Sequence, residues 1–182
     1  SDEMGTPVVE TAAAAYDLLS NQITRGAETV GVLRTALEFG RTTNADATDS
    51  VNLLSSALNS FKLQNTEAER VARIFFTTID LGRTTASEMA NSFGRSGVLG
   101  ENLGVKLEEL AAGVSSLTRQ GIKTSEAYTL LNNVFLKLIK PTEVMSGWLH
   151  RMGYESGQAA IEALGFTGVL RLLDQEFQGG TA

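Results

Sequence analysis

The sequence predicts an all-α protein, a compact stack of about eight to ten helices arranged as helical hairpins with no central sheet. Apolar residues recur at steps of three and four over most of the chain, whereas the alternation typical of strands is weak. The 182 residues also include 18 Gly but only 2 Pro. Few prolines allow long helices, and glycines supply the left-handed residues that end them.

Four apolar stripes mark helices in order along the chain. Within each stripe, apolar residues recur at i, i+3, i+4 and i+7 spacings, which puts them on one face of a helix. The stripes are Ala47, Val51, Leu54, Leu58 and Phe61; Ala68, Val71, Ala72, Phe75 and Ile79; Leu107, Leu110, Ala111, Val114 and Leu117; and Ala127, Leu130, Leu131, Val134, Phe135 and Leu138. Each stripe needs an apolar partner, which favours helices packed on helices.

Polar residues mark where several helices begin. Thr66–Glu69 and Thr85–Glu88 both fit the capping box, in which a Thr hydroxyl and a Glu carboxylate accept backbone N–H groups of the first turn. Pro141 fits the first position of a helix that carries Trp148 and Leu149.

Three glycines divide the C-terminal part of the chain. Gly153, Gly157 and Gly165 interrupt the helical pattern there. They predict short helices over about residues 155–164 and 167–177.

One heptapeptide pattern recurs along the chain. Leu37–Thr43 returns as Ile79–Thr85, 42 residues on, and more loosely as Leu117–Thr124. Each copy has the features of a helix C-terminus: Gly just past the end, a basic residue near the negative pole of the dipole, and a Thr able to cap the next helix. The unit is therefore a hairpin of about 40 residues, and neighbouring hairpins must stack. Duplication of the unit and the general likeness of helix joints both remain open as explanations.

This pattern also predicts the domain organisation. We expect hairpin joints near residues 40–43, 82–85 and 121–124, one helical domain over residues 7–177, and disordered tails at residues 1–6 and 178–182.

Composition excludes several classes of function. With a net charge of −6 and a pI near 4.9, the chain has the wrong sign for direct nucleic-acid binding. It has no Cys and a single His, His150, so that no disulfide, thiolate metal site or His-pair metal site can form within it. No apolar run approaches the length of a membrane span. We expect no catalytic, cofactor or metal site, and no cofactor.

An enzymatic reading finds little support. His150, Ser146 and either Glu143 or Glu155 could be written as a hydrolase triad, but nothing in their spacing provides an oxyanion hole or a third group that holds the base. We expect His150 in the last turn of the helix after Pro141, where a protonated imidazole would interact favourably with the negative end of the helix dipole.

Two further patterns have structural explanations. The acidic pairs Glu108–Glu109 and Glu67/Glu69 lie in predicted first turns, where capping and the helix dipole account for them. Gly94–Gly104 is glycine-rich but lacks the order of a phosphate-binding loop. We predict a flexible loop between helices there.

Aromatic residues supply the candidates for a partner surface. The neighbours Phe75 and Phe76 cannot both face one core, so Phe76 is a candidate interface residue, as is Trp148. Packing within the chain is the alternative for both.

The order of motifs resembles the core region of phage tail tape measure proteins. In this region Leu103–Leu131 carries, in order, Leu-Gly-Val, Glu-Glu-Leu-Ala, Leu-Thr-Arg-Gln-Gly-Ile and Ser-Glu-Ala. The family's next two segments match Leu136–Thr142 and Leu149–Gly153. The segment that precedes the motif in the family matches Phe75–Thr85. The resemblance runs from about Ala12 to Leu173. The positions that match are Gly82, Gly104, Gly121, Ala127, Leu138, Pro141 and Gly153, all structural in kind. The chain departs from the family at Ser96–Gly100, where many relatives have a Pro-containing segment.

The resemblance implies a structural, non-enzymatic virion protein of a phage or prophage. Such proteins lie in the lumen of the virion tail, and in the host cytoplasm during assembly. They act in tail assembly, tail-length determination and genome delivery. The implied partners are tail-tube, tail-tip or baseplate, and tail assembly chaperone proteins; self-association is left open.

The length of the chain limits this role. One unbroken helix of the whole chain would span only about 270 Å, and a stack of helices far less. We therefore expect the chain to be part of a longer protein whose other segments supply length. The alternative is an independent cytosolic adaptor built of helical repeats.

Overall fold

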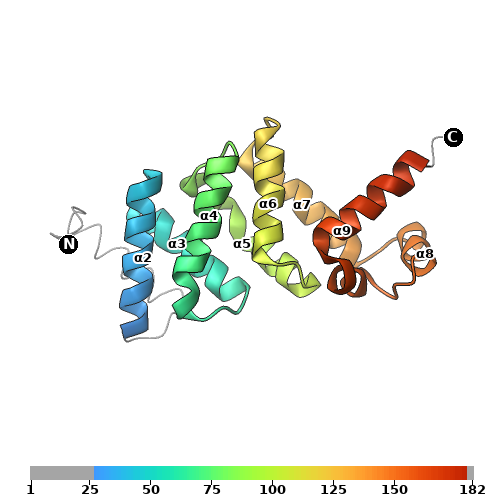
Figure 1. Ribbon diagram of the computed structural model, residues 1–182, viewed down its shortest axis with the longest axis horizontal. Coiled ribbons are helices and arrows are strands. Elements are labelled where there is room, and N and C mark those ends of the chain that lie inside the picture. Colours follow the sequence, from blue (N-terminus) through green and yellow to red (C-terminus); the bar gives the residue numbers. More distant parts are fainter. Residues whose placement is uncertain (1–26, 180–182) are drawn as a thin grey trace.

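A computed structural model describes residues 27–179 and the side chains of residues 29–176. This part of the chain contains eight α-helices and no strand: α2 (Ala27–Thr43), α3 (Ala47–Ser60), α4 (Ala68–Leu81), α5 (Ala86–Leu103), α6 (Leu107–Arg119), α7 (Thr124–Ile139), α8 (Glu143–Arg151) and α9 (Gly157–Gly179), with a short 3₁₀ turn, η1 (Asn65–Glu67), before α4 (Figure 1). The predicted all-α class is confirmed. The predicted N-terminal tail, residues 1–6, lies outside the described residues. So do residues 180–182 of the predicted C-terminal tail.

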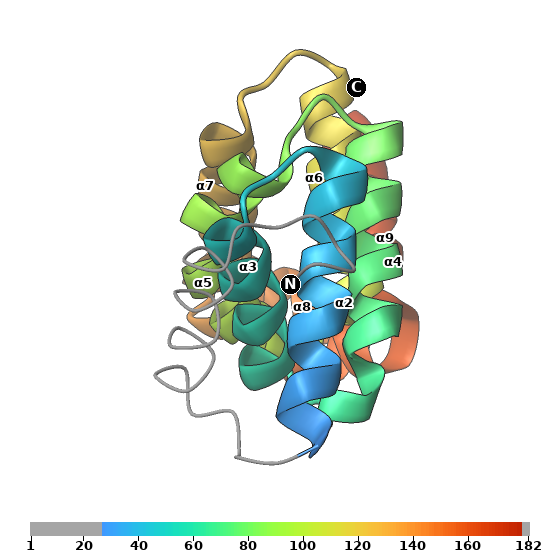
Figure 2. The ribbon, with the colours of Figure 1, turned by 90° about the vertical axis from the view of Figure 1, so that its left-hand side faces the viewer.

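The helices form two layers of stacked hairpins. Helices α2, α4 and α6 lie side by side in one layer, and α3, α5 and α7 form the other (Figures 1 and 2). Each hairpin contributes one helix to each layer, and the closest packing runs within the second layer, from α3 to α5 to α7. Helices α8 and α9 follow at the far end and depart from this two-layer pattern (Figure 1).

The apolar stripes form the core between the layers. The sequence stripes are largely buried, with Val51, Leu54, Val114 and Phe135 fully inaccessible to solvent. Leu130 departs from this pattern because 40% of its side chain is exposed, on a face of α7 that no neighbouring helix covers closely.

Phe93 on α5 lies at the centre of the stack. Its ring contacts Phe61 after α3 at 6.3 Å, Phe75 on α4 at 5.4 Å and Tyr128 on α7 at 6.3 Å between centroids, the last two edge to face. Aromatic pairs favour this arrangement. Burial raises the pKa of Tyr128 above its ordinary value because the charged phenolate would lose its hydration.

The predicted flexible loop at Gly94–Gly104 is wrong, since most of this segment is the second half of α5. Its glycines permit close packing. A Cβ atom at Gly97 would lie 2.7 Å from a Phe93 ring carbon and 2.9 Å from Cβ of Ser60 on α3. Gly104, with φ of 78°, ends the helix. Close tertiary packing thus overrides the low helix propensity of glycine.

Two of the three predicted helix starts need correction. The Thr85–Glu88 capping box is confirmed: the backbone N–H of Glu88 donates to Thr85 Oγ1 at 3.2 Å and that of Thr85 donates to the Glu88 carboxylate at 3.1 Å. At the first box, however, the backbone N–H of Gln64 donates to Glu67, because the chain enters α4 through a 3₁₀ turn. Pro141 precedes the capping residue Thr142 instead of opening α8.

The repeated joints differ more than the sequence suggests. Only Gly121 has the predicted left-handed conformation, with φ of 93°. Gly40 lies within α2, Asn44 takes the left-handed position after that helix, and Asp46 caps α3 in place of Thr43. The N-cap of α7 is Lys123, so Thr124 is not a cap. A shared sequence pattern therefore hides three local geometries.

The predicted division of the C-terminal part is confirmed at Gly153, which lies between α8 and α9 with φ of 87°, and at Gly165. Gly165 breaks α9 with φ of 72° and ψ of 165°. The second part of α9 continues to Gly179, past the predicted boundary at residue 177.

We expect Gly121→Val to lower the free energy of unfolding by at least about 1 kcal/mol, because a β-branched residue is strained at positive φ. Thermal unfolding measures this. Gly94→Ala is the matched control, since Gly94 is helical with no atom within 4 Å of an added Cβ. The control should stabilise by up to about 1 kcal/mol. An unchanged melting temperature for Gly121→Val would contradict the account.

Candidate interaction surface

The joint between α4 and α5 is held against the end of α6 by a close approach at Gly82. A Cβ atom at Gly82 would lie 2.7 Å from Thr118 Oγ1 and 2.7 Å from the Thr78 carbonyl oxygen. The backbone N–H of Arg83 donates to Thr118 Oγ1 at 3.1 Å. With φ of −101°, Gly82 is extended. Its lack of a side chain is therefore needed for space.

A second polar contact joins the starts of α5 and α7. The Thr124 hydroxyl lies 2.8 Å from Thr84 Oγ1 and 3.1 Å from the Glu88 carboxylate. Glu88 thus serves its own capping box and a neighbouring hairpin. Thr124 and Thr84 are buried, where a polar group needs a hydrogen-bond partner.

The other residues of the motif also serve joints and packing. Gly104, Gly121 and Gly153 have φ of 78°, 93° and 87° at helix ends. Ala127 and Leu138 lie on the buried face of α7. In the described chain these positions therefore lie at helix ends or in the core.

No side-chain hydrogen bond joins the residues of the hypothetical triad to one another in the described chain. His150 is exposed in the last turn of α8, as predicted, and its side chain has no hydrogen bond to a described residue. Among the described residues, no group of three His, Cys, Asp or Glu side chains could hold a metal ion. None of the described helices combines the length and the apolar character of a membrane span.

The acidic pairs take part in ion pairs and caps. Glu67 accepts hydrogen bonds from Arg70 at 2.9 and 3.1 Å, and Arg70 also contacts Glu108 on α6. The hydrogen bond to Glu67 and the charge of Glu108 raise the pKa of Arg70 despite its partial burial. Glu69 is exposed, and its carboxylate lies 3.9 Å from the Arg73 guanidinium.

Glu109 connects α6 to α9. Its carboxylate accepts the backbone N–H of Lys106 at 3.3 Å, which caps α6, and the backbone N–H of Thr167 at 3.3 Å, just after the break in α9. One side chain thus caps the starts of two helical segments.

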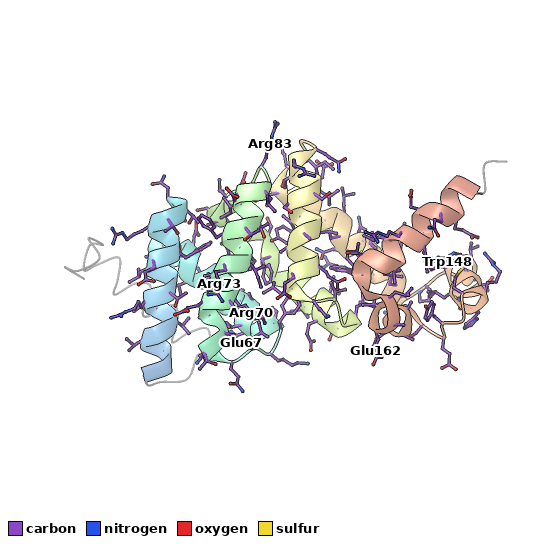
Figure 3. The ribbon with its side chains drawn as sticks, viewed as in Figure 1. Glu67, Arg70, Arg73, Arg83, Trp148 and Glu162 are labelled. Atoms are coloured by element: carbon purple, nitrogen blue, oxygen red, sulfur yellow. The ribbon has the colours of Figure 1, made fainter. Side chains whose placement is uncertain are left out.

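The two predicted interface residues lie in different surroundings. Phe76 on α4 is 47% exposed and borders a groove of about 610 Å³ between α2 and α4. Trp148 on α8 lies near one end of the molecule and is only 4% exposed (Figure 3). Of the two, Phe76 is the residue that a partner could reach directly.

Grooves continue along the layer that contains α2, α4 and α6. The groove beside Phe76 is edged by Glu38, Glu69 and Arg73. A second lies between α4 and α6 next to the exposed Leu81, and a third of about 400 Å³ lies between α6, α7 and α9 around Leu130. The sequence pattern does not predict these grooves, since they arise where helices distant in sequence meet.

The described chain is thus an all-α protein built largely from stacked helical hairpins. Its charged and polar side chains connect helices to one another, and its accessible grooves are suited to binding other proteins.

The chain belongs to the family of phage-related minor tail proteins, whose sequence model matches residues 1–182. It is therefore classed with the structural proteins of the phage tail. It is also similar to the tape measure protein of Pneumococcus phage Dp-1, with 27% identity over 117 residues. That alignment covers 64% of this chain and 10% of the phage protein. No solved structure matches the chain.

We expect Gly82→Ala to lower the free energy of unfolding by about 1–3 kcal/mol, because the added methyl group would press on the fixed Thr78 carbonyl and on Thr118. Urea unfolding measures the change. Gly31→Ala is the control, because no atom lies within 4 Å of an added Cβ there. Equal midpoints for the two variants would show that the joint is not closely packed.

Proposed function

We propose that this chain is a compact helical segment of a tape measure protein, and that it acts in tail assembly, tail-length determination and genome delivery. The alignment of most of the chain with a tenth of such a protein carries this proposal. The stack of hairpins supports it, because it offers surfaces for assembly and its polar groups serve the fold.

The family and the exposed surface support the partners that we propose. They are tail-tube, tail-tip or baseplate, and assembly chaperone proteins, met in the lumen of the virion tail or, before that, in the host cytoplasm. Phe76 and the groove between α2 and α4 are the surface that we assign to such contacts. Apolar grooves with polar edges are typical of protein interfaces.

The compact fold limits how the chain could contribute to tail length. Residues 27–179 would span about 230 Å as one unbroken helix. In the structure they are folded back into eight helices. Other segments of the protein must then provide most of the length that sets the tail length. This domain would act mainly in tail assembly.

The proposal is tested in the phage or prophage that encodes the chain. Purified virions should contain peptides of residues 27–179 that resist external protease while the tail is intact, and these peptides should leave the particle when genome release is triggered. Mass spectrometry of treated and untreated particles measures both. Virions without these peptides would refute the proposal and favour the adaptor.

We expect Phe76→Asp to reduce the yield of tailed particles at least tenfold while lowering stability by only about 1 kcal/mol or less, since the side chain is already half exposed. Val98→Asp is the control, because Val98 is 50% exposed on α5 in the other layer. Electron microscopy counts tails, and urea unfolding gives stability. Similar yields for both variants would remove Phe76 from the interface.

A further inference from the structure

Helices α8 and α9 approach the backbone of the other described helices at fewer places than α2–α7 approach one another. Helices α2–α7 contact one another extensively, whereas α8 makes no extensive contact with another described helix and α9 touches α5 and α7 sparingly. The two helices also project beyond the end of the stack (Figure 1). Segments with few buried contacts open at a lower free energy than the rest of a fold.

Side chains of these two helices, among them Leu149, Ile161 and Val169, are buried in the same apolar cluster as those of α2–α7, and three close contacts mark the junction with α6 and α7. The rings of Phe135 and Phe166 meet at 5.1 Å between centroids, and both are buried. Glu109 accepts the backbone N–H of Thr167. Gly157 lies close to Leu138, where a Cβ atom would be 2.5 Å from the carbonyl oxygen.

One ion pair joins α8 to α9, and one buried polar group in α8 lacks a partner among the described residues. Arg151 on α8 pairs with Glu176 on α9 at 2.8 Å. Trp148 is buried, yet its Nε1–H has no hydrogen-bond partner among the described residues. A buried donor without a partner costs free energy that exposure to water returns. Lys140 and Pro141 connect the hairpin to α7 by a short non-helical segment.

We propose that residues 143–179 undock from the stack as a unit while α2–α7 remain folded. Undocking exposes the apolar faces of α6 and α7 that Phe166 covers. A unit of fewer than about 40 residues without disulfides or metal has too small a core to stay folded alone, so it loses its helical structure when it leaves.

The single tryptophan makes the proposal directly measurable, because Trp148 reports on this unit alone. In a urea titration of the whole chain, we expect Trp148 fluorescence to change at a lower urea concentration than the main circular dichroism transition at 222 nm. Two probes that disagree show that unfolding is not two-state. Coincident transitions would overturn the proposal.

Hydrogen exchange with matched variants provides the second test. Phe166→Ala and Glu109→Ala should each raise the exchange rates of peptides from residues 143–179 at least tenfold, and leave those of α3 and α5 unchanged. Glu108→Ala is the control, because the neighbouring Glu108 contacts Arg70 on α4 instead of α9. Equal acceleration in α3, α5 and α9 would show one cooperative unit and refute undocking.

Discussion

The stack depends on the packing of Phe93. This one side chain contacts aromatic rings that follow α3, lie on α4 and lie on α7. No hairpin can bury its apolar stripe alone, so each needs its neighbours to be stable. Phe93 meets this need for three hairpins at once, because α5 lies in the middle of the second layer. The close packing at Gly97 brings α3 near enough for these contacts.

Carboxylates in first turns connect the hairpins at the edges of this core. Glu88 caps α5 and contacts Thr124 of α7, and Glu109 caps α6 and the second part of α9. Such a carboxylate is already favoured by the helix dipole and the free N–H groups of the first turn. The same group can therefore hold a second element with little further loss of freedom. This arrangement explains how acidic residues that look like catalytic pairs serve the architecture.

The sequence allowed prediction of the class of fold, the hairpin pattern and most of the core, because helical periodicity is a local property. It failed where long-range packing decides the outcome. The glycines of α5 predict a loop by propensity, but close contact with α3 makes them helical. Gly82 and Gly121 look equivalent in the repeat, yet one provides space beside Thr118 and the other a left-handed turn.

In the candidate interaction surface, too, local features could be predicted from the sequence and long-range packing could not. Phe76 could be predicted as exposed because its neighbour Phe75 fills the core. The groove beside it could not, because α2 and α4 are separated by a whole helix in the sequence. Leu130 belongs to an apolar stripe and is nevertheless exposed, since α9 does not continue the layer of α2, α4 and α6 closely enough to cover it.

The glycine content of α5 has a consequence for synthesis on the ribosome. Gly94, Gly97 and Gly100 each weaken an isolated helix by up to about 1 kcal/mol relative to Ala, so that α5 gains its stability mainly from its neighbours. One of those neighbours, α7, is translated about twenty residues later. The nascent chain must therefore expose the middle of its core until α7 leaves the exit tunnel. During this interval the chain is prone to aggregation, and a binding factor that shields α5 would have its greatest effect then.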